Sequence, residues 1–211
     1  MAESGVRSRL CIFARVPVAG AVKRRLVPAL GEAGALAAYT ELLEGTLTRC
    51  VNPAAYRSEL WLAGDADHPQ VGGWCRRYPL SLRAQSGADL GERMRRALED
   101  DLSVPTVLIG TDCPDIDRGY LAEAFAALER HELVLGPAVD GGYGLIGLTR
   151  PAPELFRDMP WGGPEVLRET LKRAGQAGMS CSCLPEIYDV DRPEDWARYR
   201  MLSPGPGRAT E

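Results

Sequence analysis

The sequence is short of several features that would assign it to a large functional class. Lys and Arg number 25 against 29 Asp and Glu, giving a net charge of -4, whereas general nucleic-acid binders are usually strongly basic. No stretch approaches the roughly 18 consecutive apolar residues of a membrane helix, and residues 1–9 lack the apolar core of a signal peptide. We therefore expect a cytoplasmic protein that binds neither nucleic acid nor a membrane. Acidic or phosphorylated small molecules remain possible ligands of local basic patches.

Disulfide and thiol–metal motifs are also missing. The six cysteines show neither the spacing of a secreted disulfide framework nor a CxxC pair, so reduced thiols are expected. Cys181 and Cys183 are a candidate metal pair, but alternate residues of a strand point to the same side and free cysteine packs as a small hydrophobe. We interpret the two as one face of a strand.

What is present indicates one α/β domain. A chain of 211 residues is long enough for one well-filled core and short for two. We therefore assign residues 1–200 to a single domain and expect a disordered Pro- and Gly-rich tail over 201–211. Short apolar runs predict strands at 9–14, 56–63, 80–85, 106–109 and 182–188. Helical spacing and capping signals predict helices at 32–50, 92–101, 120–130, 165–176 and 193–200.

The strand at 106–109 is the centre of the functional argument. It is a short apolar, β-branched run between a proline and a glycine, which is typical of a strand covered on both faces. Thr111 and Asp112 follow it, at the sheet edge where open α/β folds bind ligands. Asp112 is therefore our first candidate for a functional carboxylate. Capping of the next helix is the alternative, but Asp115 and Asp117 suit that role better.

A cationic loop follows the first strand. Residues 15–26 contain Gly20 and four cations within eleven residues, at Arg15, Lys23, Arg24 and Arg25. A loop with free N–H groups and several cations suits a polyphosphate, which needs both charge and hydrogen-bond donors. A solvated basic loop is the plain alternative, and neither G-x-x-x-x-G-K-[ST] nor G-x-G-x-x-G is present. The position directly after the first strand favours phosphate binding.

Two further loops carry candidate contacts. Gln85, Asp89 and Arg93 are placed to touch a nucleotide base or ribose, while Asp89 is equally well interpreted as a plain N-cap. Trp161, in the loop 159–164, either lines an acceptor pocket or covers the core, which is the more frequent role of a lone Trp. The sequence does not decide between these alternatives.

Glycine is concentrated between two apolar runs, where five of the twelve residues from 136 to 147 are Gly. A simple hairpin is one interpretation, since Gly tolerates the positive φ angles of tight turns. We favour the other, in which the glycines leave room for a ligand against bare backbone. Asp140, Gly141, Gly142 and Tyr143 would then contact that ligand.

Three Asp-x-Asp triples occur, at 65/67, 115/117 and 189/191, so the literal motif decides little. A hard cation such as Mg²⁺ or Mn²⁺ needs oxygen ligands that converge from separate elements, and it also binds substrate phosphates. Asp112 follows one buried strand while Asp189 and Asp191 follow another, so we expect the three to meet at one sheet edge. Capping of the last helix is the alternative for Asp191.

Four motifs occur in the order of a known family: Lys23-x-Arg25-Leu26, Gly110-Thr-Asp-Cys-Pro114, Gly136-Pro-Ala-x-Asp-Gly-Gly-Tyr143 and Asp189-Val-Asp-x-Pro-Glu-Asp195. Together they resemble the radical-SAM/selenodomain-associated transferase family 1, commonly labelled an arsenosugar-biosynthesis glycosyltransferase. The resemblance spans nearly the whole chain, from Arg9 to Trp196. That family usually has Lys-Thr-Arg-Leu at the first motif, so Arg24 replaces a hydroxyl with a cation.

This resemblance implies a fold and a site. The fold is the GT-A nucleotide-diphospho-sugar transferase fold, a single α/β domain with a mostly parallel, mixed central sheet flanked by helices, and it relates the chain to the guanylyltransferases that make the deazaflavin coenzyme. The implied site holds Mg²⁺ or Mn²⁺ on Asp112, assisted by Asp189 and Asp191, with the phosphates on Lys23 and Arg25. A divalent cation and fixed cations stabilise the charge that grows on a phosphate leaving group.

Two reactions and one binding role fit these residues. In glycosyl transfer, a nucleotide-sugar donor loses its nucleoside diphosphate as a small acceptor attacks the anomeric carbon. In nucleotidyl transfer, a phosphorylated acid attacks the α-phosphate of an NTP and pyrophosphate leaves. The cationic loop favours the second reaction and the family resemblance the first, which we place ahead. A nucleotide-binding protein without turnover is the third possibility, and the base, sugar, acceptor, stereochemistry and oligomeric state stay open.

The expected site residues fall into three groups besides the metal ligands. Catalytic roles are expected of Asp140, Lys23 and Arg25. Nucleotide or phosphate contacts are expected of Arg15, Gly20, Lys23, Arg24, Arg25, Gln85, Asp89, Arg93 and Thr111. Acceptor contacts are expected of Gly141, Gly142, Tyr143 and Trp161.

Overall fold

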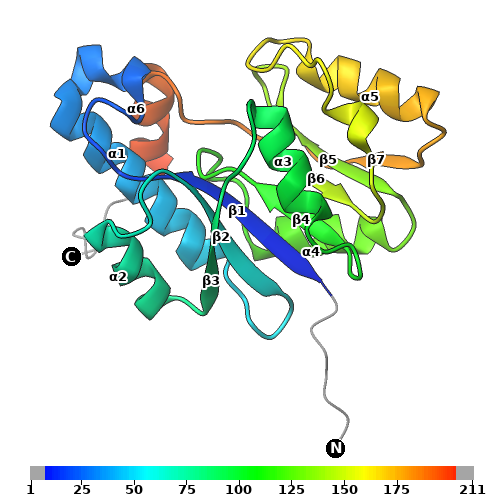
Figure 1. The fold of residues 1–211 in the computed structure, drawn as a ribbon. Coiled ribbons are helices and arrows are strands. Elements are labelled where there is room, and N and C mark those ends of the chain that lie inside the picture. The colour runs from blue at the N-terminus through cyan, green and yellow to red at the C-terminus, as the bar shows by residue number, and fades with distance from the viewer. Residues whose placement is uncertain (1–7, 203–211) are drawn as a thin grey trace, which may run out of the picture.

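Within the described residues 8–202, the computed structural model is a seven-stranded sheet with helices on both faces (Figure 1). The strands are β1 (Arg9–Arg15), β2 (Arg57–Ala63), β3 (Leu80–Ala84), β4 (Thr106–Ile109), β5 (Leu133–Pro137), β6 (Tyr143–Leu148) and β7 (Cys181–Cys183). The helices are α1 (Val27–Cys50), α2 (Pro69–Arg77), α3 (Leu90–Glu99), α4 (Arg118–Leu128), α5 (Val166–Gln176) and α6 (Pro193–Leu202). Two short 3-10 helices, η1 (Arg24–Leu26) and η2 (Pro153–Leu155), complete these elements.

The strands lie in the order β3-β2-β1-β4-β6-β5-β7. β6 is antiparallel to its neighbours β4 and β5, and the other pairs are parallel. This confirms the mostly parallel, mixed sheet. Because β2 and β4 lie on opposite sides of β1, the chain changes direction across the sheet there, and such a switch point opens a crevice at the carboxyl ends of the strands.

The helices form two layers with separate cores. α1, α2 and α4 pack their apolar residues against one face of the sheet. α3 and α5 pack against the other face. α6 joins the first layer, where Tyr199 packs with Leu42 of α1. Both faces of the central strands are therefore buried, and so are all four residues of β4, as the sequence predicts.

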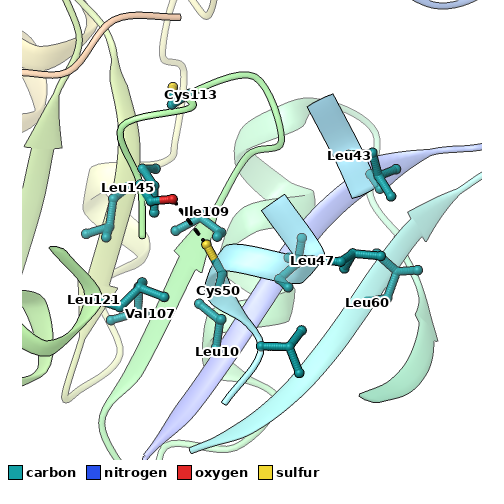
Figure 2. Packing of buried hydrophobic residues seen from close by; sticks show 14 of the residues in the cluster. Leu10, Leu43, Leu47, Cys50, Leu60, Val107, Ile109, Cys113, Leu121 and Leu145 are labelled. Carbon is teal, nitrogen blue, oxygen red and sulfur yellow. Dashed lines mark hydrogen bonds between the residues drawn. The ribbon is translucent and has the colours of Figure 1, made fainter. Parts of the chain in front are cut away.

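The packing beneath the carboxyl end of β4 is shown in Figure 2, where Leu47 and Cys50 of α1 meet Ile109 of β4. The Cys50 thiol donates a hydrogen bond to the carbonyl of Ile116, at 3.4 Å. This contact ties the end of α1 to the loop that follows β4. The loop carrying Asp112 is thus anchored on the core.

Several boundaries differ from the prediction. α1 begins five residues early, but Gly31 has a φ of 69° and interrupts the helix directly before the predicted start at residue 32. α2 was missed, because Gly72, Gly73 and a helix-starting proline resemble a loop. The predicted strand 182–188 is shorter, covering 181–183 with one isolated bridge at Ile187. Cys181 and Cys183 do lie in this strand.

The tail predicted over 201–211 is wrong for its first two residues. Met201 and Leu202 are the last residues of α6. The remainder of the predicted tail, 203–211, lies outside the described residues, as does most of the polar N-terminal stretch. Within the part of the chain that is described, no helix is both long and apolar enough to cross a membrane.

Candidate functional site

A cavity of about 540 Å³ lies at the carboxyl ends of β1 and β4. Its wall is completed by the amino end of α3, the β5–β6 hairpin, the loop before α5 and the segment that leads to α6. The expected site residues that line it are Arg15, Gln85, Asp89, Arg93, Thr111, Asp112, Asp140, Gly142, Tyr143, Trp161 and Asp189. The position matches the crevice expected at the switch point of the strand order.

Three carboxylates from distant segments face this cavity. Asp112 follows β4, Asp140 lies in the β5–β6 hairpin, and Asp189 precedes α6. The backbone joins two of these segments directly, because Val190 N donates to the carbonyl of Asp112 at 2.8 Å. The convergence of Asp112 and Asp189 predicted from the sequence is therefore present.

Mutual repulsion marks this group of carboxylates. Burial raises the pKa of Asp189, and the neighbouring charge of Asp140 raises it further. Burial also raises the pKa of the Cys113 thiol, with Asp112 next in importance. Buried and negatively charged groups thus lie close together here, which is an electrostatic pattern of functional sites.

Lys23 lies behind Asp112 rather than in the cavity. Its side chain is only 3% exposed, and Nζ donates to the carbonyl of Val190 at 2.6 Å while lying 2.8 Å from Asp112 Oδ1. The contact with Asp112 is an ion pair without hydrogen-bond geometry, so the buried Oδ1 has no hydrogen-bond partner. The Asp112 side chain as a whole is 47% exposed. The carboxylate of Asp112 is thus paired with Lys23 on its buried side and is exposed on the other side.

Most of the cationic loop beyond Arg15 also lies outside the cavity wall. Gly20, Arg24 and Arg25 are not among the lining residues. Arg25 forms an exposed ion pair with Asp191. Asp191 is thereby committed to a cation, and no described hydrogen bond shows its side chain capping α6. Instead Asp195 accepts from the backbone N–H groups of Asp191 and Arg192, at 3.2 and 2.8 Å.

Two other cations do line the cavity. Arg15 is exposed at the end of β1, and its backbone N–H and carbonyl are both bound by the hydroxyl of Tyr39, at 2.7 and 2.8 Å. Arg93, on the first turn of α3, donates through Nε to the carbonyl of Gly87 at 3.1 Å. Within residues 8–202 neither side chain forms an ion pair. Both guanidinium groups are therefore available to an anion.

Two polar side chains of the loop before α3 form hydrogen bonds with backbone groups. Asp89 is the N-cap of α3 and accepts from Glu92 N at 2.8 Å. The Gln85 amide donates to the carbonyls of Ala14 and Trp61, at 3.0 and 2.9 Å. The capping interpretation of Asp89 is confirmed, and both residues also border the cavity.

The glycine-rich segment is a hairpin whose glycines mostly face protein. Gly141 has a φ of 88°, and a Cβ there would lie 2.1 Å from the carbonyl oxygen of Pro164. A Cβ at Gly144 would meet Cys113, one at Gly136 would meet Tyr120, and one at Gly147 would meet Val134. The interpretation of these glycines as room for a ligand is therefore wrong for most of them. Close packing explains them instead.

The remaining acceptor candidates form an aromatic wall. Tyr143 and Trp161 line the cavity with their rings at 88° and 6.5 Å apart. The Trp161 indole lies flush against α3, because a Cβ at Gly91 would be 2.6 Å from it. It also packs on Phe156 in the core. Trp161 therefore both lines the cavity and covers the core, and its contact with an acceptor stays a prediction.

The chemistry of this donor set partly fits a divalent cation. In residues 8–202, no three His, Cys, Asp or Glu side chains are grouped closely enough to enclose a metal. Mg²⁺, however, is usually held by one or two carboxylates together with substrate phosphates. The open side of Asp112 and the repelled carboxylate of Asp189 fit that arrangement, whereas Asp191 is paired with Arg25. Asp112 and Asp189 are thus the residues that would hold such an ion.

Sequence reasoning missed several cavity residues. Tyr39 of α1 fixes Arg15 and borders the cavity. Phe13 and Met94 line the wall as well. Phe13 was predictable, because alternate residues of a strand share a face and Arg15 follows it by two. Tyr39 and Met94 carried no such signal, since their helices pack on the sheet whether or not a ligand binds.

The architecture is that of the nucleotide-diphospho-sugar transferase and nucleotidyltransferase folds. Residues 46–163 match the family described as "Uncharacterized protein conserved in bacteria (DUF2064)", and the chain belongs to this family. Among curated protein sequences, none matches significantly. The narrower resemblance to the radical-SAM-associated transferases stays a prediction.

Solved structures give the same assignment of the fold. The chain is 30% identical to a protein of Desulfovibrio desulfuricans G20 named "putative nucleotide-diphospho-sugar transferase", with a TM-score of 0.85 over 97% of this chain and 91% of that one. A 4-diphosphocytidyl-2C-methyl-D-erythritol synthase of Anaerococcus prevotii is 10% identical, with a TM-score of 0.63 over 92% and 95% of the two chains. Glucosyl-3-phosphoglycerate synthase of Mycobacterium tuberculosis is 12% identical, with a TM-score of 0.54 over 94% and 78%.

Proposed function

We propose that this protein is a nucleotide-using transferase that moves a glycosyl group from a nucleotide-diphospho-sugar to a small acceptor. One observation carries the proposal: a single cavity at the switch point collects four carboxylates, and two arginines without an ion pair in residues 8–202, from segments far apart in the sequence. The similarity to a protein named as a nucleotide-diphospho-sugar transferase supports it. So does the fold shared with a synthase whose complex contains Mn²⁺ and UDP.

The cavity divides into a charged part and an apolar part. Arg15 and Arg93 are placed to hold a diphosphate, and the guanidinium fork binds phosphate oxygens in pairs. Tyr143 and Trp161 form the apolar wall on which an acceptor rests. When bound, Mg²⁺ or Mn²⁺ would neutralise the charge that grows on the departing diphosphate. Asp112 and Asp189 would hold the ion.

Asp140 is the proposed general base. Its Oδ1 accepts a hydrogen bond from Gly142 N at 2.9 Å, which fixes the carboxylate at the cavity's edge. There it takes the proton of the acceptor hydroxyl while the acceptor oxygen bonds to the anomeric carbon. The bond between that carbon and the phosphate oxygen breaks, and the nucleoside diphosphate leaves with the electron pair. Orientation and proton transfer are what the chain itself contributes.

The test is a product assay on the intact protein. We expect nucleoside diphosphate to be released when the protein is incubated with Mn²⁺ and UDP- or GDP-sugars in the presence of hydroxylated and phosphorylated small acceptors. Asp140→Asn should lower turnover about 100-fold or more without weakening nucleotide binding. Release of pyrophosphate from an NTP, with no nucleoside diphosphate from any sugar donor, would contradict glycosyl transfer.

Nucleotidyl transfer is the second candidate, and Arg24 is the observation in its favour. Arg24 is the first residue of η1, is exposed, and forms no ion pair within residues 8–202. A third phosphate reaching out of the cavity toward it would gain a counter-charge that a diphosphate cannot use. Arg24→Met then weakens GTP binding and leaves GDP binding unchanged. Equal effects on both nucleotides would count against this candidate.

A further inference from the structure

Lys23 occupies a place that a phosphate ligand would not. Its ammonium is buried and is absent from the cavity wall. It lies between Asp112 and Val190, which belong to segments far apart in the sequence. One contact is with the carboxylate of Asp112 at 2.8 Å and the other is with the carbonyl of Val190 at 2.6 Å. A flexible, exposed lysine would reach into the solvent instead.

The backbone around Lys23 is adapted to this placement. Lys23 has a φ of 45°, in the left-handed region that residues other than glycine seldom adopt. Leu26 N donates to the Lys23 carbonyl at 2.8 Å, which starts η1. Leu26 itself has no exposed surface and packs against Ala35, Ala38 and Trp196. The packing of Leu26 thus holds the left-handed backbone of Lys23 in place, as is common where a side chain must point in one fixed direction.

We propose that Lys23 is a positioning residue that acts through Asp112, and that it does not bind phosphate. Its ammonium fastens Asp112 Oδ1 from behind, so that the other carboxylate oxygen faces the cavity. The same ammonium fixes Val190, and with it the adjacent Asp189. The two carboxylates that would share a cation are thereby kept in register by one buried side chain. The phosphates are left to Arg15 and Arg93.

The proposal rests in part on the proposed nucleotide-binding function, but one arm of its test needs no ligand. Four variants of the intact chain are compared: Lys23→Met, Asp112→Asn, the two combined, and Lys172→Met. Lys172 is the chain's other lysine; it is 58% exposed and pairs with Glu169 on α5. In thermal unfolding, Lys23→Met and Asp112→Asn should each lower the midpoint by about 3–6 °C, and the double variant should fall no further than the worse single one. Lys172→Met should stay within about 1 °C.

Calorimetric titration with UDP, GDP and GTP forms the second arm. Lys23→Met should weaken nucleotide binding in the presence of Mn²⁺ about tenfold or more, as loss of an outer-shell partner does, and should leave binding in EDTA unchanged within about twofold. In the Asp112→Asn background the same substitution should change affinity less than twofold, because coupled residues are not additive. Arg15→Met, by contrast, should weaken binding both with and without Mn²⁺.

Two results would overturn the proposal. One is a Lys23→Met effect on nucleotide affinity that is equally large in the Asp112→Asn background and in EDTA, as expected of a direct phosphate ligand. The other is strict additivity of the two substitutions in thermal unfolding. If the parent protein binds none of the nucleotides, the proposed function fails, and the thermal comparison alone decides the role of Lys23.

Discussion

One buried cation, Arg9, lies at the start of β1 and another, Lys23, lies in the loop that follows this strand, and their surroundings differ. At the amino end, Arg9 has no exposed surface. It pairs with Glu59 at 3.1 Å, donates to the carbonyls of Ala97 and Leu98 at 2.8 Å each, and donates to Thr106 at 3.2 Å. Beyond the carboxyl end, Lys23 meets a carboxylate whose side chain is nearly half exposed and whose Oδ1 has no hydrogen-bond partner.

The difference separates a structural pair from a functional one. Buried ions are tolerated when each is paired and its remaining hydrogen-bonding groups are satisfied. The Arg9 network meets that condition and closes the amino end of the sheet against α3. The Asp112 carboxylate is paired on one side only and is nearly half exposed in the wall of a cavity, which is expected of a group that a ligand completes.

The largest effect is expected at the amino end. Arg9→Met leaves the Glu59 carboxylate buried without its main partner, which should lower the free energy of unfolding by about 3–5 kcal/mol. Urea denaturation measures this. Arg57→Met is the matched control, because Arg57 approaches the same carboxylate at 3.7 Å but its side chain is 43% exposed. This substitution should lower the free energy of unfolding by less than about 1 kcal/mol. Similar losses for both would remove the distinction between the buried pair and an ordinary surface one.

The next largest loss of stability is expected at the cavity, where Trp161 contacts Gly91. Gly91→Ala forces a methyl group to within 2.6 Å of the indole, and such overpacking should cost about 1–3 kcal/mol. The displaced ring should also shift the tryptophan fluorescence. Gly73→Ala, in α2, is the control because its Cβ meets nothing within 4 Å, and it should raise stability slightly. A stable Gly91→Ala protein with unchanged fluorescence would show that the aromatic wall is not seated on α3.

Asp112→Asn sharpens the comparison directly. The asparagine keeps the shape and an acceptor oxygen but removes the charge beside Lys23. We expect the free energy of unfolding to fall by only about 1–2 kcal/mol, which is well under the loss expected for Arg9→Met. A loss as large as that of Arg9→Met would mean that both pairs are structural.

The smallest effect concerns the two roles of Asp89. Asp89→Ala removes the N-cap of α3 and should lower stability by about 1 kcal/mol, while Asp89→Ser restores the cap. Nucleotide affinity is then measured for both. Recovery of stability without recovery of affinity would show that the carboxylate also contacts the ligand. Recovery of both would leave Asp89 as a cap alone.

The sequence predicts the sheet and its functional edge well, for physical reasons. The fully buried strand before Asp112 is evident from four consecutive apolar or β-branched residues, and the capping side chain of Asp117 accepts from Tyr120 N as its position before α4 indicates. The short α2 was missed because its two glycines and initial proline are as typical of a loop. Local patterns identify long, regular elements, whereas short ones depend on packing.

The site was predictable only as far as its carboxylates. Strand ends place Asp112 and Asp189 together, because β4 and β7 run in the same direction and the segments that follow them leave the sheet at one edge. The direction of the cationic loop was not predictable, since Lys23 turns inward through a left-handed backbone and Arg25 turns to Asp191. A charged residue in a loop is equally compatible with binding a ligand and with fastening another side chain. Only three-dimensional contacts separate the two.

The most direct test of the account is calorimetric titration of the parent protein and of Asp112→Asn with UDP and GDP in the presence of Mn²⁺. We predict that the parent protein binds one nucleotide per chain and that Asp112→Asn loses the increment in affinity that Mn²⁺ provides. Undiminished binding of the Mn²⁺-nucleotide by Asp112→Asn, or no binding by the parent protein, would contradict it.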